Sequence, residues 1–136
     1  MAKNRGNRPN VTNEKVPGGH EPKDFGKEHP KFCLRHVQKN FDVDNLTTKG
    51  QAELARTLQR LASITWNEIQ TSQRHGLGTE KLAKSMFKTR IPLAFEDRED
   101  FTAFRYHENR PMVGVRVRDV FQVIWIEADY GDLYKH

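Results

Sequence analysis

Cysteine is almost absent from this sequence. Cys33 is the only cysteine among the 136 residues, so no disulfide can form within the chain and a reducing compartment is expected. No apolar run approaches the roughly 20 residues that a membrane-spanning helix needs, and the first residues lack the apolar core of a signal peptide. We therefore expect a cytoplasmic protein that does not enter a membrane.

The short motifs that identify several large enzyme classes are also missing. The sequence has no Walker loop, no dinucleotide glycine fingerprint, no His-Glu-x-x-His and no Gly-x-Ser-x-Gly. Cys33 and His36 have a spacing found in zinc sites, but such a site needs four ligands and no second pair is nearby. The acidic residues Asp97, Glu99 and Asp100 are not followed by the lysine of a metal-dependent nuclease, so a solvated loop explains them. We expect no metal and no cofactor.

Apolar residues are scarce in the first 30 positions. Four of the six prolines and four of the nine glycines lie there, and Val11, Val16 and Phe25 are almost the only apolar side chains. Such a segment buries too little surface to offset the entropy lost on ordering. The sequence therefore predicts a disordered or extended arm over residues 1–30 and a single domain over residues 31–136.

Positive charge is in modest excess. The formal net charge is +5 at pH 7, and 30% of the residues are charged. This balance favours association with polyanions. It also occurs in many soluble proteins that bind no nucleic acid, so charge alone does not decide the partner.

Apolar residues at helical spacing predict two helices after the arm. Thr48 with Gln51 fits a capping box, and a leucine stripe follows. A second start signal, Thr65 with Glu68, interrupts the stripe. The predicted helices cover roughly residues 49–63 and 66–74, the second ending before Gly76 and Gly78.

Shorter segments complete the N-terminal part of the domain. Residues 31–37 predict a strand. Residues 79–86 predict a short helical turn capped by Thr79. Residues 90–93 predict a loop or a sheet edge, because Pro92 cannot donate to a strand ladder.

The last third of the chain predicts an antiparallel meander over residues 101–107, 111–118 and 120–127, and the chain ends with Tyr134, Lys135 and His136. A tight turn at Arg118 and Asp119 would place Val117 opposite Val120, and residues directly opposite share a face. One predicted face is aliphatic and should cover the helices: Val113, Val115, Val117, Val120, Ile124 and Ile126. The other is mixed: Met112, Gly114, Arg116, Phe121, Val123, Trp125 and Glu127. One register of the first hairpin adds Arg105 beside Met112 on the mixed face.

The mixed face carries side chains suited to metal-free RNA cleavage. That reaction needs a base for the 2′-hydroxyl, a cation for the phosphate and a proton for the 5′-oxygen. Arginine suits the phosphate because its planar fork grips two oxygens, and an exposed aromatic ring can stack an unpaired base. The candidate catalytic residues are Arg105, Arg116, Glu127, Tyr134 and His136, and the candidate RNA-binding residues are Arg118, Phe121, Trp125 and Lys135.

Each of these residues also has an ordinary structural interpretation. Arg116 and Glu127 could form a surface ion pair worth less than about 1 kcal/mol. Trp125 could belong to the core beneath a loop, and His136 could be a solvated residue near a chain end.

The order of a strand at 31–37, two helices at 49–74 and a meander at 101–135 resembles the RelE/ParE superfamily of small toxins. The resemblance covers about residues 31–136. It implies an α+β single domain with an N-terminal strand, a two-helix hairpin and an antiparallel sheet packed on the helices. It also implies a cytoplasmic mRNA endoribonuclease, often ribosome-associated, that a cognate antitoxin neutralises.

By the same resemblance, Phe104-Arg105-Tyr106 is similar to the strand that bears a phosphate-binding arginine, and Val115-Arg116 to the next strand. Tyr134 and His136 are similar to the Tyr and His that some members use in proton transfer, and Glu127 is a looser candidate for the base. The arm, Trp125 and the turn at 129–132 have no counterpart in that pattern.

Two further functions remain open from the residues alone. In one, a patch formed by Phe121 and Trp125 binds a protein partner without catalysis. In the other, the basic protein binds DNA or ribosomal RNA as a passive accessory. Binding through several phosphates should weaken steeply with salt, whereas an apolar interface should not.

Overall fold

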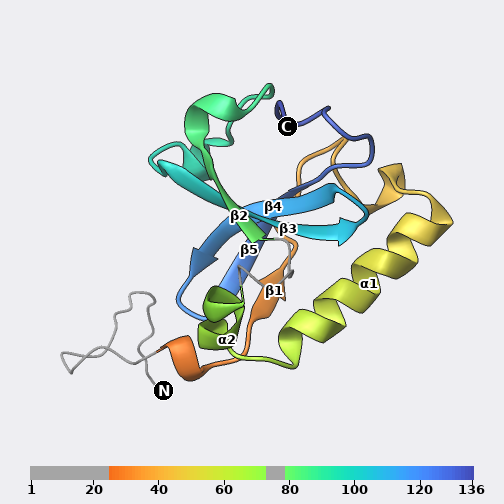
Figure 1. Cartoon of the computed structure of the whole chain (residues 1–136). Helices are drawn as coiled ribbons and strands as arrows, with labels where there is room; N and C mark the ends of the chain where they lie inside the picture. The colour runs from red at the N-terminus through yellow and green to blue at the C-terminus, as the bar shows by residue number, and fades with distance from the viewer. Residues whose placement is uncertain (1–24, 73–78) are drawn as a thin grey trace, which may run out of the picture.

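The computed structural model describes residues 25–72 and 79–136 of the chain. They form an α+β domain with two helices and a five-stranded mixed sheet, which confirms the predicted fold class (Figure 1). The helices are α1 (Thr48–Ala62) and α2 (Trp66–Thr71). The strands, in the sheet order β1-β5-β4-β3-β2, are β1 (Lys31–Cys33), β5 (Val120–Ile126), β4 (Arg110–Val117), β3 (Asp100–His107) and β2 (Thr79–Ala83). Within the described ranges no helix is long and apolar enough to cross a bilayer.

Both helices begin at threonine caps. The Thr47 hydroxyl accepts a hydrogen bond from the Gly50 amide, so α1 is capped one residue earlier than predicted. The predicted start signal of α2 is confirmed, since Thr65 and Glu68 form a reciprocal capping box. The predicted division into two helices is therefore correct to within one residue at the starts, and the positions of Gly76 and Gly78 lie outside the described residues.

The N-terminal strand is shorter than predicted and runs parallel to its neighbour. Only Lys31–Cys33 pair with β5, in register from Lys31 opposite Val120. The chain then turns away, and Leu34 is 47% exposed. Lys31 also pairs with Asp119, Nζ to Oδ2 2.5 Å. The sheet is thus mixed because one parallel strand closes its edge.

Residues 79–83 are a strand, so the predicted helical turn capped by Thr79 is wrong there. β2 pairs antiparallel with β3 along its whole length, from Thr79 opposite Phe104 to Ala83 opposite Asp100. Leu82 is completely buried. Pairing with an open sheet edge outweighs the helical preference of Glu, Lys, Leu and Ala in this segment.

The domain extends N-terminal to residue 31. Residues Phe25–Lys27 form a 3₁₀ turn against α2, and Gly26 is so close to Asn67 that a Cβ would lie 2.2 Å from its Oδ1. The Trp66 amide donates to the Glu28 carbonyl (3.0 Å). Residues 25–30 therefore belong to the domain and not to the predicted arm, while residues 1–24 lie outside the described residues.

One hydrophobic core lies between the helices and the sheet. Figure 1 shows α1 and α2 on the same side of the sheet. The buried helical residues pack against aromatic and large apolar side chains of the strands. The cluster comprises Leu46, Leu54, Leu61, Trp66, Ile69, Phe104, Tyr106, Met112, Phe121, Val123 and Ile126.

A second core covers the opposite side of the sheet. Segments 84–98 and 128–136 pack there and bury the valines of β4. Its members are Leu82, Phe95, Phe101, Ala103, Val113, Val115, Ile124, Trp125, Leu133 and Tyr134. The prediction that the aliphatic face covers the helices is therefore wrong. Of the face predicted to be mixed and accessible, Met112, Phe121 and Val123 pack beneath the helices, whereas Trp125 lies in the second core.

A β-bulge in β5 rearranges the predicted faces. The turn at Arg118 and Asp119 and the pairing of Val117 with Val120 are confirmed, but Val113 lies opposite Trp125 instead of Ile124. Two residues of β5 then oppose one of β4, so Ile124 and Trp125 point to the same side. Gly114 permits this approach, since a Cβ there would lie 1.9 Å from the Gln122 carbonyl oxygen. The bulge moves Trp125 and Glu127 to the face opposite Phe121.

Candidate functional site

The sequence-predicted site residues divide between the two ends of the sheet. Figure 1 shows α2 and the β4–β5 turn at one end, and the β3–β4 turn, the start of α1 and the C-terminal segment toward the other. Arg116 and Arg118 lie at the α2 end. Arg105, Glu127, Tyr134, Lys135 and His136 lie toward the other end. The prediction that Arg105, Arg116 and Trp125 share one face is wrong.

Arg116 faces the helix side and packs on an indole. Its guanidinium carbon lies 4.3 Å from the centre of the Trp66 ring, and its Nε donates to the Arg118 carbonyl at 2.7 Å. Arg118 itself is exposed, with a φ of 60° in the tight turn. These contacts give Arg116 a structural role between α2 and the β4–β5 turn.

Phe121 and Trp125 are not surface residues. Each has 0% exposure, and they lie in different cores on opposite faces of the sheet. Trp125 stacks on Phe87 with 4.7 Å between ring centroids. Neither ring can stack a base or form an exposed patch in this structure, so both the predicted RNA contact and the predicted protein-binding patch at these residues are wrong.

Glu127 and His136 form a buried carboxylate–imidazole pair. Glu127 is completely buried just after β5, and its Oε1 lies 2.9 Å from His136 Nε2. The other oxygen, Oε2, accepts from the Leu133 amide at 2.8 Å. A carboxylate accepts hydrogen bonds, so His136 carries its proton on Nε2 and leaves Nδ1 as the unprotonated nitrogen of the neutral ring. This is the arrangement in which a carboxylate orients a histidine base.

Two tyrosines enclose the His136 ring. Tyr130 stacks on it with 3.8 Å between centroids, and Tyr134 lies on it at 4.1 Å. The His136 side chain is 8% exposed, whereas Tyr130 is 54% exposed. The stack holds the imidazole in place and presents one aromatic ring to solvent.

Tyr134 and Arg105 are electrostatic neighbours at this site. Burial raises the pKa of Tyr134 above its ordinary range, Glu80 and Glu127 raise it further, and Arg105 opposes them. The phenol therefore stays protonated at neutral pH and cannot act as a base. Arg105 lies opposite Pro111, not beside Met112, so it lies on the face of the second core. Its Nη2 is 3.5 Å from Glu80 Oε1, and the Arg105 side chain is 40% exposed.

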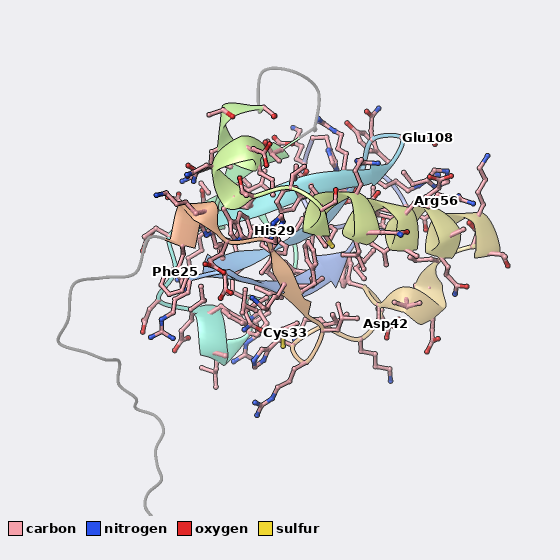
Figure 2. The ribbon with its side chains drawn as sticks, turned by 90° about the horizontal axis from the view of Figure 1, so that it is seen from below. Phe25, His29, Cys33, Asp42, Arg56 and Glu108 are labelled. Carbon is pink, nitrogen blue, oxygen red and sulfur yellow. The ribbon has the colours of Figure 1, made fainter. Side chains whose placement is uncertain are left out.

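Other sequence candidates form no site in the described ranges. No group of three or more His, Cys, Asp or Glu residues there could hold a metal ion. Figure 2 shows Cys33 on β1, and the ring of His36 lies edge-on to Phe95 at 5.1 Å. Asp97, Glu99 and Asp100 are exposed, and Asp100 begins β3. Lys135, which precedes His136 in the chain, is exposed.

Sequence reasoning missed Tyr130 and Glu80. Tyr130 follows the last strand in an irregular turn, where no periodicity predicts which way a side chain points. Glu80 was placed in a helical turn, so its pairing with Arg105 across β2 and β3 could not be foreseen. The alternation of the β3 sequence does indicate that Arg105 lies opposite in face to Phe104 and Tyr106.

No protein-family model matches this sequence, and neither a curated protein nor a solved structure is significantly similar to it.

Proposed function

We propose that this protein binds RNA and cleaves it without a metal ion, with His136 as the group that takes the proton from the 2′-hydroxyl. The single observation that carries the proposal is the contact of His136 Nε2 with the buried Glu127 carboxylate at 2.9 Å. It leaves Nδ1 able to accept a proton, and the carboxylate stabilises the imidazolium that results.

The reaction needs no other reagent than water. Nδ1 takes the 2′-hydroxyl proton, the 2′-oxygen attacks phosphorus, and the bond from phosphorus to the 5′-oxygen breaks. The leaving oxygen takes a proton from water, and His136 returns its proton to solvent. The products are a 2′,3′-cyclic phosphate and a 5′-hydroxyl.

The surrounding side chains support the remaining tasks. Arg105 is 40% exposed at the same end of the sheet, so its guanidinium can neutralise charge on the phosphate. Glu80 shares that guanidinium at 3.5 Å, a distance at which a phosphate can displace it. Tyr130 offers the exposed ring on which an unpaired base can stack. Lys135 adds a second exposed cation.

The proposal extends to the biological setting that the toxin resemblance implies. The RNA would be mRNA, bound to ribosomes or free, in the cytoplasm. A cognate antitoxin would then neutralise the activity. Inducible expression should arrest growth, and coexpression of the antitoxin should restore it.

The test uses the substitution His136→Gln, whose amide can still donate to Glu127. We expect cleavage of single-stranded RNA in EDTA to fall by roughly 100-fold or more, with the melting temperature nearly unchanged. The matched control is His29→Gln, because His29 bonds the Ile64 carbonyl near α2, away from the pair. A folded His136→Gln protein that still cleaves RNA and arrests growth like wild type would overturn the proposal.

A non-enzymatic role is favoured by one observation, the enclosure of the His136 side chain at 8% exposure. If this role is correct, the contact of His136 with Glu127 only fastens residues 133–136 to β5, and the domain binds nucleic acid or protein passively. It predicts that Glu127→Gln and His136→Gln lower stability together and that wild-type protein produces no cyclic-phosphate ends on RNA.

A further inference from the structure

A cavity of about 330 Å³ lies on the helix side of the sheet, at the end where residues 128 and 129 follow β5. Its walls come from the first turn of α1, the β3–β4 hairpin and the residues after β5. Figure 2 shows Glu108 at that hairpin turn. The volume is in the range of small-ligand sites. The residues that matter for recognition are Lys49, His107, Glu108, Arg110 and Asp129.

Arg110 lines this cavity and has one nitrogen without a hydrogen bond in the described part of the chain. Its Nη1 donates to His107 Nδ1 at 3.2 Å and to Glu108 Oε1 at 3.1 Å. Its Nε is buried and meets no acceptor within residues 25–72 and 79–136. A buried donor without an acceptor is unfavourable, so a ligand acceptor would stabilise the site once the guanidinium turns Nε, which has almost no accessible surface here, toward the cavity. The Nε edge of a guanidinium accommodates two acceptors side by side.

His107 contributes a donor. Because its Nδ1 accepts from Arg110, the proton of the neutral ring is on Nε2. Lys49 adds a cationic donor from α1. The Gly50 amide at the start of α1 is not available to a ligand, because it already donates to the Thr47 hydroxyl at 3.0 Å.

The charges of the cavity favour a ligand with both acceptors and donors. Lys49 and Arg110 are balanced by Glu108 and Asp129, so a simple anion would meet two carboxylates. Guanine presents the acceptors O6 and N7 together, which match an arginine fork. It also presents the donors N1–H and N2–H₂, which match a carboxylate such as Asp129. Adenine places a donor beside N7 and would leave part of the fork unpaired.

We infer that this cavity is a subsite for a guanine base of the RNA, an inference that rests on the proposed function. Its wall includes Ala128 and Asp129, the two residues that follow Glu127. The Tyr106 hydroxyl, from another wall, donates to the Glu127 carbonyl at 2.8 Å. The Glu127 side chain lies on the other face of the sheet, so a strand with its guanine here crosses the end of the sheet to reach His136.

The test titrates the intact chain with GMP, AMP and inorganic phosphate by calorimetry. We expect GMP to bind at least about tenfold more tightly than AMP, because a bidentate arginine contact discriminates by that amount or more, and we expect phosphate not to compete. Arg110→Ala and Asp129→Ala should each weaken GMP binding. The matched control is Arg56→Ala, because Arg56 pairs with Glu53 on the outer surface of α1, outside the cavity.

Two comparisons separate this inference from the proposed function. His136→Gln should bind GMP like wild type, and that result supports the subsite even if no RNA is cleaved. If RNA cleavage depends on His136 but the protein binds GMP no better than AMP, the guanine subsite is overturned and the proposed function is supported. Equal binding of GMP and AMP with competition by phosphate would instead identify a phosphate site and overturn the guanine assignment.

Discussion

The guanidinium of Arg116 lies over the Trp66 ring, 4.3 Å from its centre. This contact joins β4 to α2 and lies at the opposite end of the sheet from His136. We expect Arg116→Ala to lower the free energy of unfolding by about 1 kcal/mol, the usual worth of such a contact. The RNA cleavage that we propose should be unchanged in the folded variant. Urea unfolding followed by tryptophan fluorescence measures the first effect; Arg116→Lys, which keeps a cation, should lose less. Loss of cleavage at full stability would place Arg116 in the site after all.

Tyr130 and Trp125 should respond differently to truncation. Tyr130 is 54% exposed but stacks on His136, so Tyr130→Ala should cost about 0.5 to 1.5 kcal/mol of stability. It should also weaken single-stranded RNA binding by about 1 to 3 kcal/mol if a base stacks there. Trp125 is completely buried, so Trp125→Ala should cost roughly 3 to 5 kcal/mol of stability. Fluorescence anisotropy of labelled RNA and thermal melts measure the two quantities. Unaltered RNA binding by Tyr130→Ala would remove this ring from the interface.

Gly114 should tolerate no side chain. A Cβ at this position would lie 1.9 Å from the Gln122 carbonyl oxygen and 3.1 Å from Val123 Cα, and backbone atoms cannot move aside cheaply. Gly114→Ala should therefore destabilise the fold by about 3 kcal/mol or more. Gly131 is the comparison, since it has open space but a φ of +94°. Gly131→Ala should cost only about 1 to 2 kcal/mol. Similar losses in the two melts would contradict the role assigned to the bulge.

Acid should weaken the start of α2 through Glu68. Hydrogen bonds from the Thr65 backbone and hydroxyl hold the pKa of Glu68 below its ordinary value of 4.5. Because the folded pKa is the lower one, its stabilisation is present above 4.5 and is lost as pH falls through the folded pKa. The stability difference between wild type and Glu68→Gln should thus shrink on acidification below 4.5. A difference that stays constant in urea titrations from pH 6 to pH 3 would show that the charge contributes nothing.

Alkali should lower the stability of the fold by ionising Tyr106. Burial raises the pKa of Tyr106 from 10.0 to about 12, and its hydroxyl donates to the Glu127 carbonyl. Because the folded pKa is the higher one, its stabilisation is complete below 10 and is lost as pH rises toward 12. Ultraviolet absorbance measures phenolate formation. The signal that wild type has and Tyr106→Phe lacks should appear only near pH 12. Ionisation near pH 10 in the folded protein would show that this phenol is accessible to water.

The local parts of the fold could be predicted from the sequence, and the long-range parts could not. The cap formed by Thr65 and Glu68 and the turn at Arg118 and Asp119 depend on neighbouring residues, so both were predicted correctly. The β-bulge depends on contact between Gly114 and Gln122 across two strands. No periodicity reveals it, and one extra residue reverses the face of everything beyond it.

In the candidate site, too, local features could be predicted from the sequence and long-range contacts could not. Alternation along a strand would have separated Arg105 from Phe104 correctly, but the chosen hairpin register slipped by one residue. On the face of the second core the charge of Arg105 is paired, because Glu80 on the neighbouring strand meets it. The contact of Glu127 with His136 crosses an irregular turn, where spacing carries no geometric information.

β1 is synthesised long before β5, the strand with which it pairs in parallel. The helices and β1 leave the ribosome long before the strands that cover them, so their apolar side chains stay without a partner until residue 126 is available. The imidazole of His136 joins the carboxylate of Glu127 only after every strand has been made. Any activity of this pair thus remains latent until the domain is complete.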